Sequence, residues 1–158
     1  MSTLRPVLAI DPGLTESGVV LWNGAAVLST GVVPNERVLV MLSECSHPVA
    51  CEMIASYGMA VGKTVFETCV WIGRFAQTAY DTNLNWNFIF RQEVKLHLCH
   101  STRAKDTNVR QALIDRFGDV GTKKDPGPLF GVKSHAWAAL ALAVTFHDKV
   151  YATSTFSK

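Results

Sequence analysis

The segment Val7-Leu8-Ala9-Ile10-Asp11-Pro12-Gly13 brings an apolar run directly against an acid and a turn. A short continuous apolar run that ends at turn residues is typical of a central strand covered on both faces. An acid at the mouth of such a strand is costly unless water or a cation neutralises it. Asp-Pro-Gly is also a common turn sequence, so Asp11 is either a turn residue or a ligand.

A second apolar run, Val49-Ala50-Cys51-Glu52-Met53-Ile54, also carries an acid. Turn chemistry explains Glu52 less well, because apolar residues continue on both sides of it. If the two strands are neighbours in a sheet, the carboxylates of Asp11 and Glu52 converge at one edge. Mg²⁺ is held by one or two carboxylates together with substrate phosphate oxygens, and two such ions can clamp an in-line phosphodiester hydrolysis. The pair therefore indicates a candidate metal site.

The hydrophobic pattern of the whole chain predicts an α/β fold with a central five-stranded mixed sheet flanked by helices, in a single domain over residues 1–158. Three antiparallel strands come first, with Asn23-Gly24 as a hairpin turn, and the later strands alternate with helices. Ser134 is the expected N-cap of the last helix. The expected strands are 4–10, 17–22, 25–33, 48–53 and 86–90, and the expected helices are 36–45, 63–80, 93–98, 107–117 and 134–150.

The composition is that of a globular protein that needs no disulfides. The chain has 158 residues, of which 48% are hydrophobic and 18% charged, and this excludes a disordered chain. Its four cysteines lack the close spacing of zinc or redox motifs, so we expect a reducing, cytoplasmic setting. No charged-then-apolar leader precedes the first strand, and no apolar run reaches the roughly 18 residues of a membrane helix. We therefore expect no membrane partner.

Charge is distributed unevenly along the chain. Residues 91–133 contain nine basic and five acidic residues, a net charge of +4, whereas the rest contains six and eight, a net charge of −2. A basic second half beside an acidic first half is typical of a phosphate-binding face next to a metal site. An ordinary solvated surface explains the same charges equally well.

Several stretches, taken in order, resemble RuvC-type Holliday junction resolvases of the ribonuclease H-like superfamily. They are residues 10–18 (IDPGLTESG), 51–54 (CEMI), 93–95 (EVK), 104–106 (AKD) and 135–141 (HAWAALA), together with the long helix after the second stretch. The resemblance thus covers nearly the whole chain. The compact length and the divergent, Trp-rich details suggest a bacteriophage or prophage version, acting in the cytoplasm of a bacterial or phage-infected cell.

The resemblance implies a homodimeric endonuclease that nicks four-way DNA junctions with Mg²⁺, or Mn²⁺ as a substitute. Asp11, Glu52 and His135 would be its catalytic metal ligands. The helix expected over residues 63–80 would supply part of the dimer interface. One departure stands out, because the family places a further ligand, normally aspartate, where this chain has Ala138.

Three explanations of Ala138 remain open. Ala138 stands in place of a native aspartate in an inactivated chain, or another acid, Asp106 or Asp125, supplies the ligand. Alternatively the chain is a natural variant that works with fewer ligands and favours Mn²⁺. We expect Asp106 to be the N-cap of its helix rather than a ligand.

The resemblance and the charges also predict contacts to DNA. Lysines suit backbone phosphates because they act as flexible point charges, and the family places a catalytic lysine beside the scissile phosphate, here Lys95 or Lys105. Tyr57 lies where the family places an aromatic that stacks on unpaired bases, although packing on its own loop is equally compatible. The expected phosphate contacts are Lys95, Arg103, Lys105, Lys123 and Lys124.

Other functions share some of these features. A nuclease of the same fold could act on flaps or forks, and a junction-binding protein without catalysis would explain Ala138 directly. A sugar-kinase-like ATPase also has an Asp-x-Gly strand, but no second phosphate loop follows in this sequence.

Overall fold

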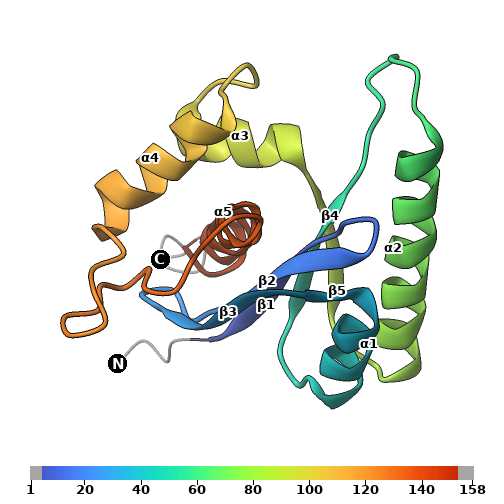
Figure 1. The fold of residues 1–158 in the computed structure, drawn as a ribbon, viewed down its shortest axis with the longest axis horizontal. Coiled ribbons are helices and arrows are strands. Elements are labelled where there is room, and N and C mark those ends of the chain that lie inside the picture. Colours follow the sequence, from blue (N-terminus) through green and yellow to red (C-terminus); the bar gives the residue numbers. More distant parts are fainter. Residues whose placement is uncertain (1–4, 153–158) are drawn as a thin grey trace, which may run out of the picture.

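A computed structural model describes residues 5–152, which form one five-stranded mixed sheet with helices on both faces (Figure 1). The strand order across the sheet is β3-β2-β1-β4-β5; β1 pairs antiparallel with β2 and parallel with β4. This confirms the predicted fold class. The strands are β1 (Val7–Asp11), β2 (Glu16–Trp22), β3 (Val27–Pro34), β4 (Val49–Met53) and β5 (Trp86–Phe90).

The helices divide between the two faces of the sheet (Figure 1). The first two cover one face, and the last three cover the other, where the final helix lies directly on the strands. No helix within residues 5–152 is long and apolar enough to cross a membrane. The helices are α1 (Asn35–Glu44), α2 (Lys63–Asp81), α3 (Arg91–Cys99), α4 (Asp106–Phe117) and α5 (Ala136–His147), and a π-helical turn, Asp148–Ala152, follows.

Every predicted element is present, with ends shifted by a few residues. Residue 4, where the first strand was expected to begin, lies outside the described residues. The prediction of Ser134 as N-cap is wrong. α5 begins at Ala136, and Ser134 adopts a left-handed φ of 49° in the turn before it. That turn is closed by the backbone, since the Trp137 N–H donates to the Ser134 carbonyl at 3.2 Å. All four cysteines are free, as expected.

Alternation along the central strands decides which face carries the acids. Ala9 of β1 and Ala50 of β4 are buried in the core against α5, whereas Ile10 is buried against α1 and α2. Successive side chains on a strand point to opposite faces. Asp11 and Glu52, each two residues after one of these alanines, therefore lie on the face that α5 covers.

Candidate metal and nucleic-acid site

Asp11 and Glu52 lie side by side at the ends of neighbouring parallel strands. Ile10 of β1 is in register with Cys51 of β4, so the next residue on each strand is an acid. Both carboxylates line one cleft of about 150 Å³. The Asp11 side chain is 13% exposed and the Glu52 side chain 15% exposed. The predicted convergence of the two acids is confirmed.

A buried polar network supports the turn that follows Asp11. The Ser17 hydroxyl donates to Asn35 Oδ1 at 2.6 Å, and the Asn35 side-chain amide donates to the Gly13 carbonyl at 2.9 Å. A Cβ at Gly13 would collide with the Glu16 carbonyl, so this turn requires glycine. Sequence reasoning missed Ser17 and Asn35, and the only signal was a serine at the start of an apolar strand. The network fixes the path of the backbone immediately after Asp11.

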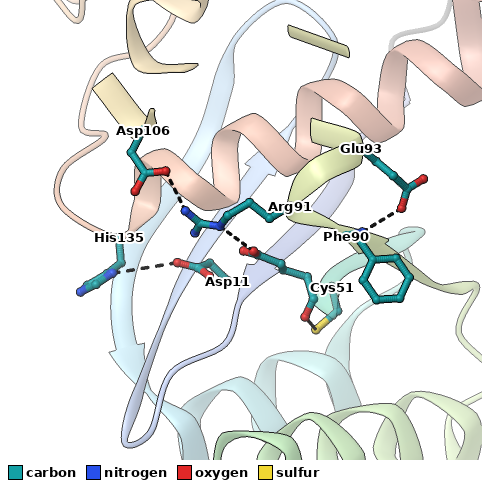
Figure 2. A network of polar contacts seen from close by, with 8 residues as sticks. Asp11, Cys51, Phe90, Arg91, Glu93, Asp106 and His135 are labelled. Atoms are coloured by element: carbon teal, nitrogen blue, oxygen red, sulfur yellow. Dashed lines mark hydrogen bonds and ion pairs between the residues drawn. The ribbon is translucent and has the colours of Figure 1, made fainter. Parts of the chain in front are cut away.

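His135 reaches the same cleft through the start of α5. Asp11 pairs with Gly18 of β2, and a Cβ at Gly18 would lie 2.5 Å from the His135 carbonyl oxygen. Glycine therefore allows the beginning of α5 to approach the sheet beside Asp11. His135 Nδ1 lies 4.0 Å from Asp11 Oδ2, and the imidazole is otherwise exposed to solvent (Figure 2).

Arg91 is the cation that contacts the carboxylates of this cleft, which Lys95 and Arg110 also line. Its Nε donates to Glu52 Oε1 at 2.9 Å, and its Nη1 donates to Asp106 Oδ1 at 2.7 Å (Figure 2). The same alternation explains its direction, because Ile89 of β5 is buried on the α5 side and Arg91 is two residues further on. Sequence reasoning counted Arg91 only in the basic stretch. Its position directly after a strand neighbouring that of Glu52 was the available signal.

The charges in the cleft perturb one another. Burial raises the pKa of Asp11 to about 8, and the negative charge of Glu52 and a hydrogen bond with it act in the same direction, while Arg91 opposes them. Burial alone would lower the pKa of Arg91. Its hydrogen bond to Glu52 and the charges of Glu52, Asp106 and Asp11 outweigh burial, so the pKa lies above its usual value. The cluster thus holds more negative charge than Arg91 neutralises.

The donors present fit a hard divalent cation through two carboxylates. Asp11 and Glu52 offer oxygen ligands of the kind that Mg²⁺ uses with one or two carboxylates and phosphate oxygens. Within residues 5–152, no group of three or more acid, histidine or cysteine side chains is arranged to hold a metal ion. His135, at 4.0 Å from Asp11, is not drawn into a closed ligand set with the two acids.

Ala138 lines the cleft, so the expected but missing acid would have faced Asp11 and Glu52. Of the two acids that could replace it, Asp106 lines the cleft and Asp125 does not. The N-cap prediction for Asp106 is wrong by one residue. Asp106 is the first residue of α4, and the N-cap is Lys105, whose N–H donates to the Asn108 side chain at 2.9 Å. The Asp106 carboxylate therefore remains available to Arg91.

Comparison with known proteins identifies the fold. No model of a protein family and no curated protein matches the chain. Thermus thermophilus RuvC in complex with a Holliday junction substrate is similar in structure, with a TM-score of 0.70 and 21% identity over 98% of both chains. A second Thermus thermophilus RuvC structure gives a TM-score of 0.67 and 24% identity over 98% of this chain and 99% of that one. The fold is the ribonuclease H-like fold of RuvC.

Within this RuvC fold, the predicted phosphate-binding residues fall into two groups. Lys95 of α3 lines the cleft, and Arg103 and Lys105 are exposed just before α4 begins. Lys123 and Lys124 are exposed in the loop after α4, at the opposite end of that helix (Figure 1). The 12 residues of α4 separate its ends by roughly 18 Å. The structure thus places three of the five near the cleft and two outside it.

Two further features concern surfaces outside the carboxylate cluster. Tyr57 is half-exposed in the β4–α2 loop, which projects beyond the sheet (Figure 1), and its φ is 49°. About half of its surface is therefore accessible to solvent. On α2, Phe66 and Val70 are 61% and 64% exposed, one helical turn apart. Sequence reasoning also missed Arg110, whose guanidinium lies 4.6 Å from the Trp137 ring in the cleft wall.

Proposed function

We propose that this chain is a divalent-metal-dependent endonuclease that resolves four-way DNA junctions by nicking two strands. The observation that carries the proposal is a buried pair of carboxylates in a basic-rimmed cleft of the RuvC fold. The likeness in structure extends over 98% of both chains, and the Thermus protein was determined with a Holliday junction substrate. Paired nicking requires a two-fold dimer, which would present identical sites to opposite strands, and we propose that the chain forms one.

In the proposed reaction, Asp11 and Glu52 hold Mg²⁺, or Mn²⁺ as a substitute. When bound, the ion supplies Lewis-acid stabilisation of the charge that develops on the phosphate. Lys95 and Lys105 hold the phosphate, and the exposed His135 imidazole accepts a proton from the attacking water. The water oxygen would bond to phosphorus while the bond to the 3′ oxygen breaks, and the 3′ oxygen would take a proton from solvent, which leaves a 5′-phosphate and a 3′-hydroxyl.

The surfaces beyond the cleft support a role in junction binding. Arg103, Lys123 and Lys124 extend the basic face toward the DNA arms, and Tyr57 stacks on bases left unpaired at the crossover. The exposed apolar turn of α2 at Phe66 and Val70 contributes to a homodimer interface. Such a chain would act in the cytoplasm of a bacterial or phage-infected cell, as part of DNA recombination.

Cleavage of matched substrates tests this function. A four-way junction, a 5′ flap and a linear duplex of shared sequence are incubated with the chain in Mg²⁺ and in Mn²⁺. Symmetric nicking of the junction, abolished by Asp11→Asn, is the expected result. Preferential cleavage of the flap would instead assign the chain to the flap and fork nucleases.

A second candidate is a junction-binding protein without catalysis. It is favoured by Ala138, which leaves the cleft one acid short, and by the absence of a closed three-ligand group among the described residues. It requires tight junction binding with no nicking in either metal. Comparison with Ala138→Asp separates the cases. Activity that appears only in the variant marks the chain as an inactivated form, whereas equal activity means that the existing ligands suffice.

A further inference from the structure

Arg91 occupies the position in the carboxylate cluster where a cation would be expected. Its guanidinium joins Glu52, on β4, to Asp106, on α4, through contacts of 2.9 and 2.7 Å (Figure 2). Glu52 is 39 residues and Asp106 is 15 residues from Arg91 along the chain. Three segments of the fold therefore converge on one positive charge, directly beside Asp11.

This arrangement leaves few ligands for a pair of metal ions. Two-metal nuclease sites hold their ions about 3.5–4 Å apart and need carboxylates that serve both. Glu52 Oε1 and Asp106 Oδ1 already accept hydrogen bonds from Arg91, and Ala138 offers no oxygen ligand. The carboxylate oxygens that remain are both of Asp11 and the second oxygens of Glu52 and Asp106, and the Asp106 side chain is 77% exposed whereas Asp11 and Glu52 are 13% and 15% exposed.

We infer that Arg91 acts as a built-in cation that takes the place of one metal ion, so that the cleft accepts a single divalent ion, held by Asp11 and Glu52. This inference rests on the proposed metal-dependent function. The charges agree with it. Asp11, Glu52 and Asp106 carry three negative charges when ionised, and Arg91 with one divalent ion carries three positive charges.

Arg91 also has donors to spare for the phosphate. A guanidinium presents five N–H groups in a planar fork that matches phosphate oxygens. Among the contacts within residues 5–152, Arg91 uses Nε and Nη1, so Nη2 is free to donate to a phosphate oxygen. An ammonium group would supply the charge without this geometry, which makes Arg91→Lys an informative variant.

Counting bound ions in the absence of DNA tests the inference. Isothermal titration calorimetry and the electron paramagnetic resonance of free Mn²⁺ measure the number of ions per chain at pH 8.5. We expect one Mn²⁺ per wild-type chain. In Arg91→Gln, which retains a donor but loses the charge, we expect a second ion to bind, or the first to bind roughly tenfold or more tightly because a nearby positive charge is gone.

The controls separate a lost charge from a lost fold. Arg110→Gln removes a second arginine from the wall of the same cleft, where it faces Trp137 rather than a carboxylate, and should leave one ion per chain. Arg91→Lys should also bind one ion and, by circular dichroism, remain folded, so the inference stays testable if Arg91→Gln does not fold. Two ions in the wild type, or in Arg91→Lys, would overturn the inference.

The same titration distinguishes this inference from the proposed function. Wild-type chain that binds two ions and cleaves junctions would refute the role of Arg91 alone. Equal stoichiometry and affinity in wild type and folded Arg91→Gln would do the same, and would assign Arg91 to holding α3, β4 and α4 together. If neither the wild type nor Ala138→Asp binds an ion, metal-dependent cleavage itself is refuted, and the inference with it.

Discussion

Replacement of Asp11 by asparagine should change how the stability of the metal-free protein depends on pH. The pKa of Asp11 is raised from 3.8 to about 8 by burial and by Glu52, so the folded protein binds this proton more tightly than the unfolded chain. Stability from the protonated carboxyl is fully present below pH 4. It is lost as the pH rises toward 8, because ionisation then favours the unfolded chain.

The expected size follows from the shift. A difference of about 4 pKa units at about 1.36 kcal/mol per unit is about 5 to 6 kcal/mol between pH 4 and pH 8 and above. This value is a ceiling, since the side chain is 13% exposed and shares its proton with Glu52. Asp11→Asn cannot ionise, so the free energy of unfolding of the variant minus that of wild type should rise steadily across this range.

Urea unfolding in EDTA at five or six pH values between 4 and 9, followed by circular dichroism, measures this difference. Asp106→Asn is the matched control, because Asp106 lies in the same cleft but is exposed and is the smallest of the influences on Asp11. The free energy of unfolding of Asp106→Asn should fall with rising pH nearly as steeply as that of wild type. Mg²⁺ should restore stability to wild type above pH 8 and have little effect on Asp11→Asn. A difference between Asp11→Asn and wild type that stays flat from pH 4 to 8 would refute the reasoning.

Three further outcomes follow from the packing. Gly18→Ala places a Cβ 2.5 Å from the His135 carbonyl oxygen. Thermal unfolding should therefore show that the free energy of unfolding falls by about 1–3 kcal/mol, and junction cleavage should also fall. An unchanged melting curve would contradict the close approach. Asp148→Asn breaks the paired contacts of 2.6 and 2.8 Å from Arg116, at a cost of about 1–2 kcal/mol because Arg116 is partly solvated. Burial raises the pKa of Asp148, but the hydrogen bonds to Arg116 and His97 outweigh it and leave this pKa below its usual value. The difference from wild type should therefore shrink as the pH falls, and urea unfolding at pH 3 and 7 checks this. Phe66→Glu puts a charge on the exposed turn of α2 and should yield monomers in analytical ultracentrifugation, whereas a persistent dimer would exclude this surface as the interface.

Local patterns were enough to predict the sheet and its pair of acids. Strands β1 and β4 are continuous apolar runs because both of their faces are covered, and this property can be read from neighbouring residues. Their parallel pairing then brings Asp11 beside Glu52, as predicted. The resemblance to RuvC-type resolvases correctly predicted the fold, and the apolar run at the C-terminal end became the buried helix α5.

Sequence reasoning did not find the partners that hold the site. Arg91 looked like one basic residue among nine, and Asp106 looked like a helix cap. Their ion pair could not be predicted from either residue alone, because an ion pair forms only where the fold brings two segments together. Lys123 and Lys124 show the opposite error, since the basic stretch groups them with Lys95, Arg103 and Lys105 but they lie at the other end of α4 from the cleft.

The sequence by itself thus determined the strands and the acid at the end of each of β1 and β4, because alternation and apolar runs are local properties, while the pairing of β1 with β4 brought Asp11 beside Glu52. Only the tertiary structure decided what surrounds that pair. Close packing of α5 on Gly18 brings His135 and Ala138 to the cleft, and the junction of β4, α3 and α4 brings Arg91 between Glu52 and Asp106. These contacts join residues far apart in the chain, and the strength of each depends on burial and distance.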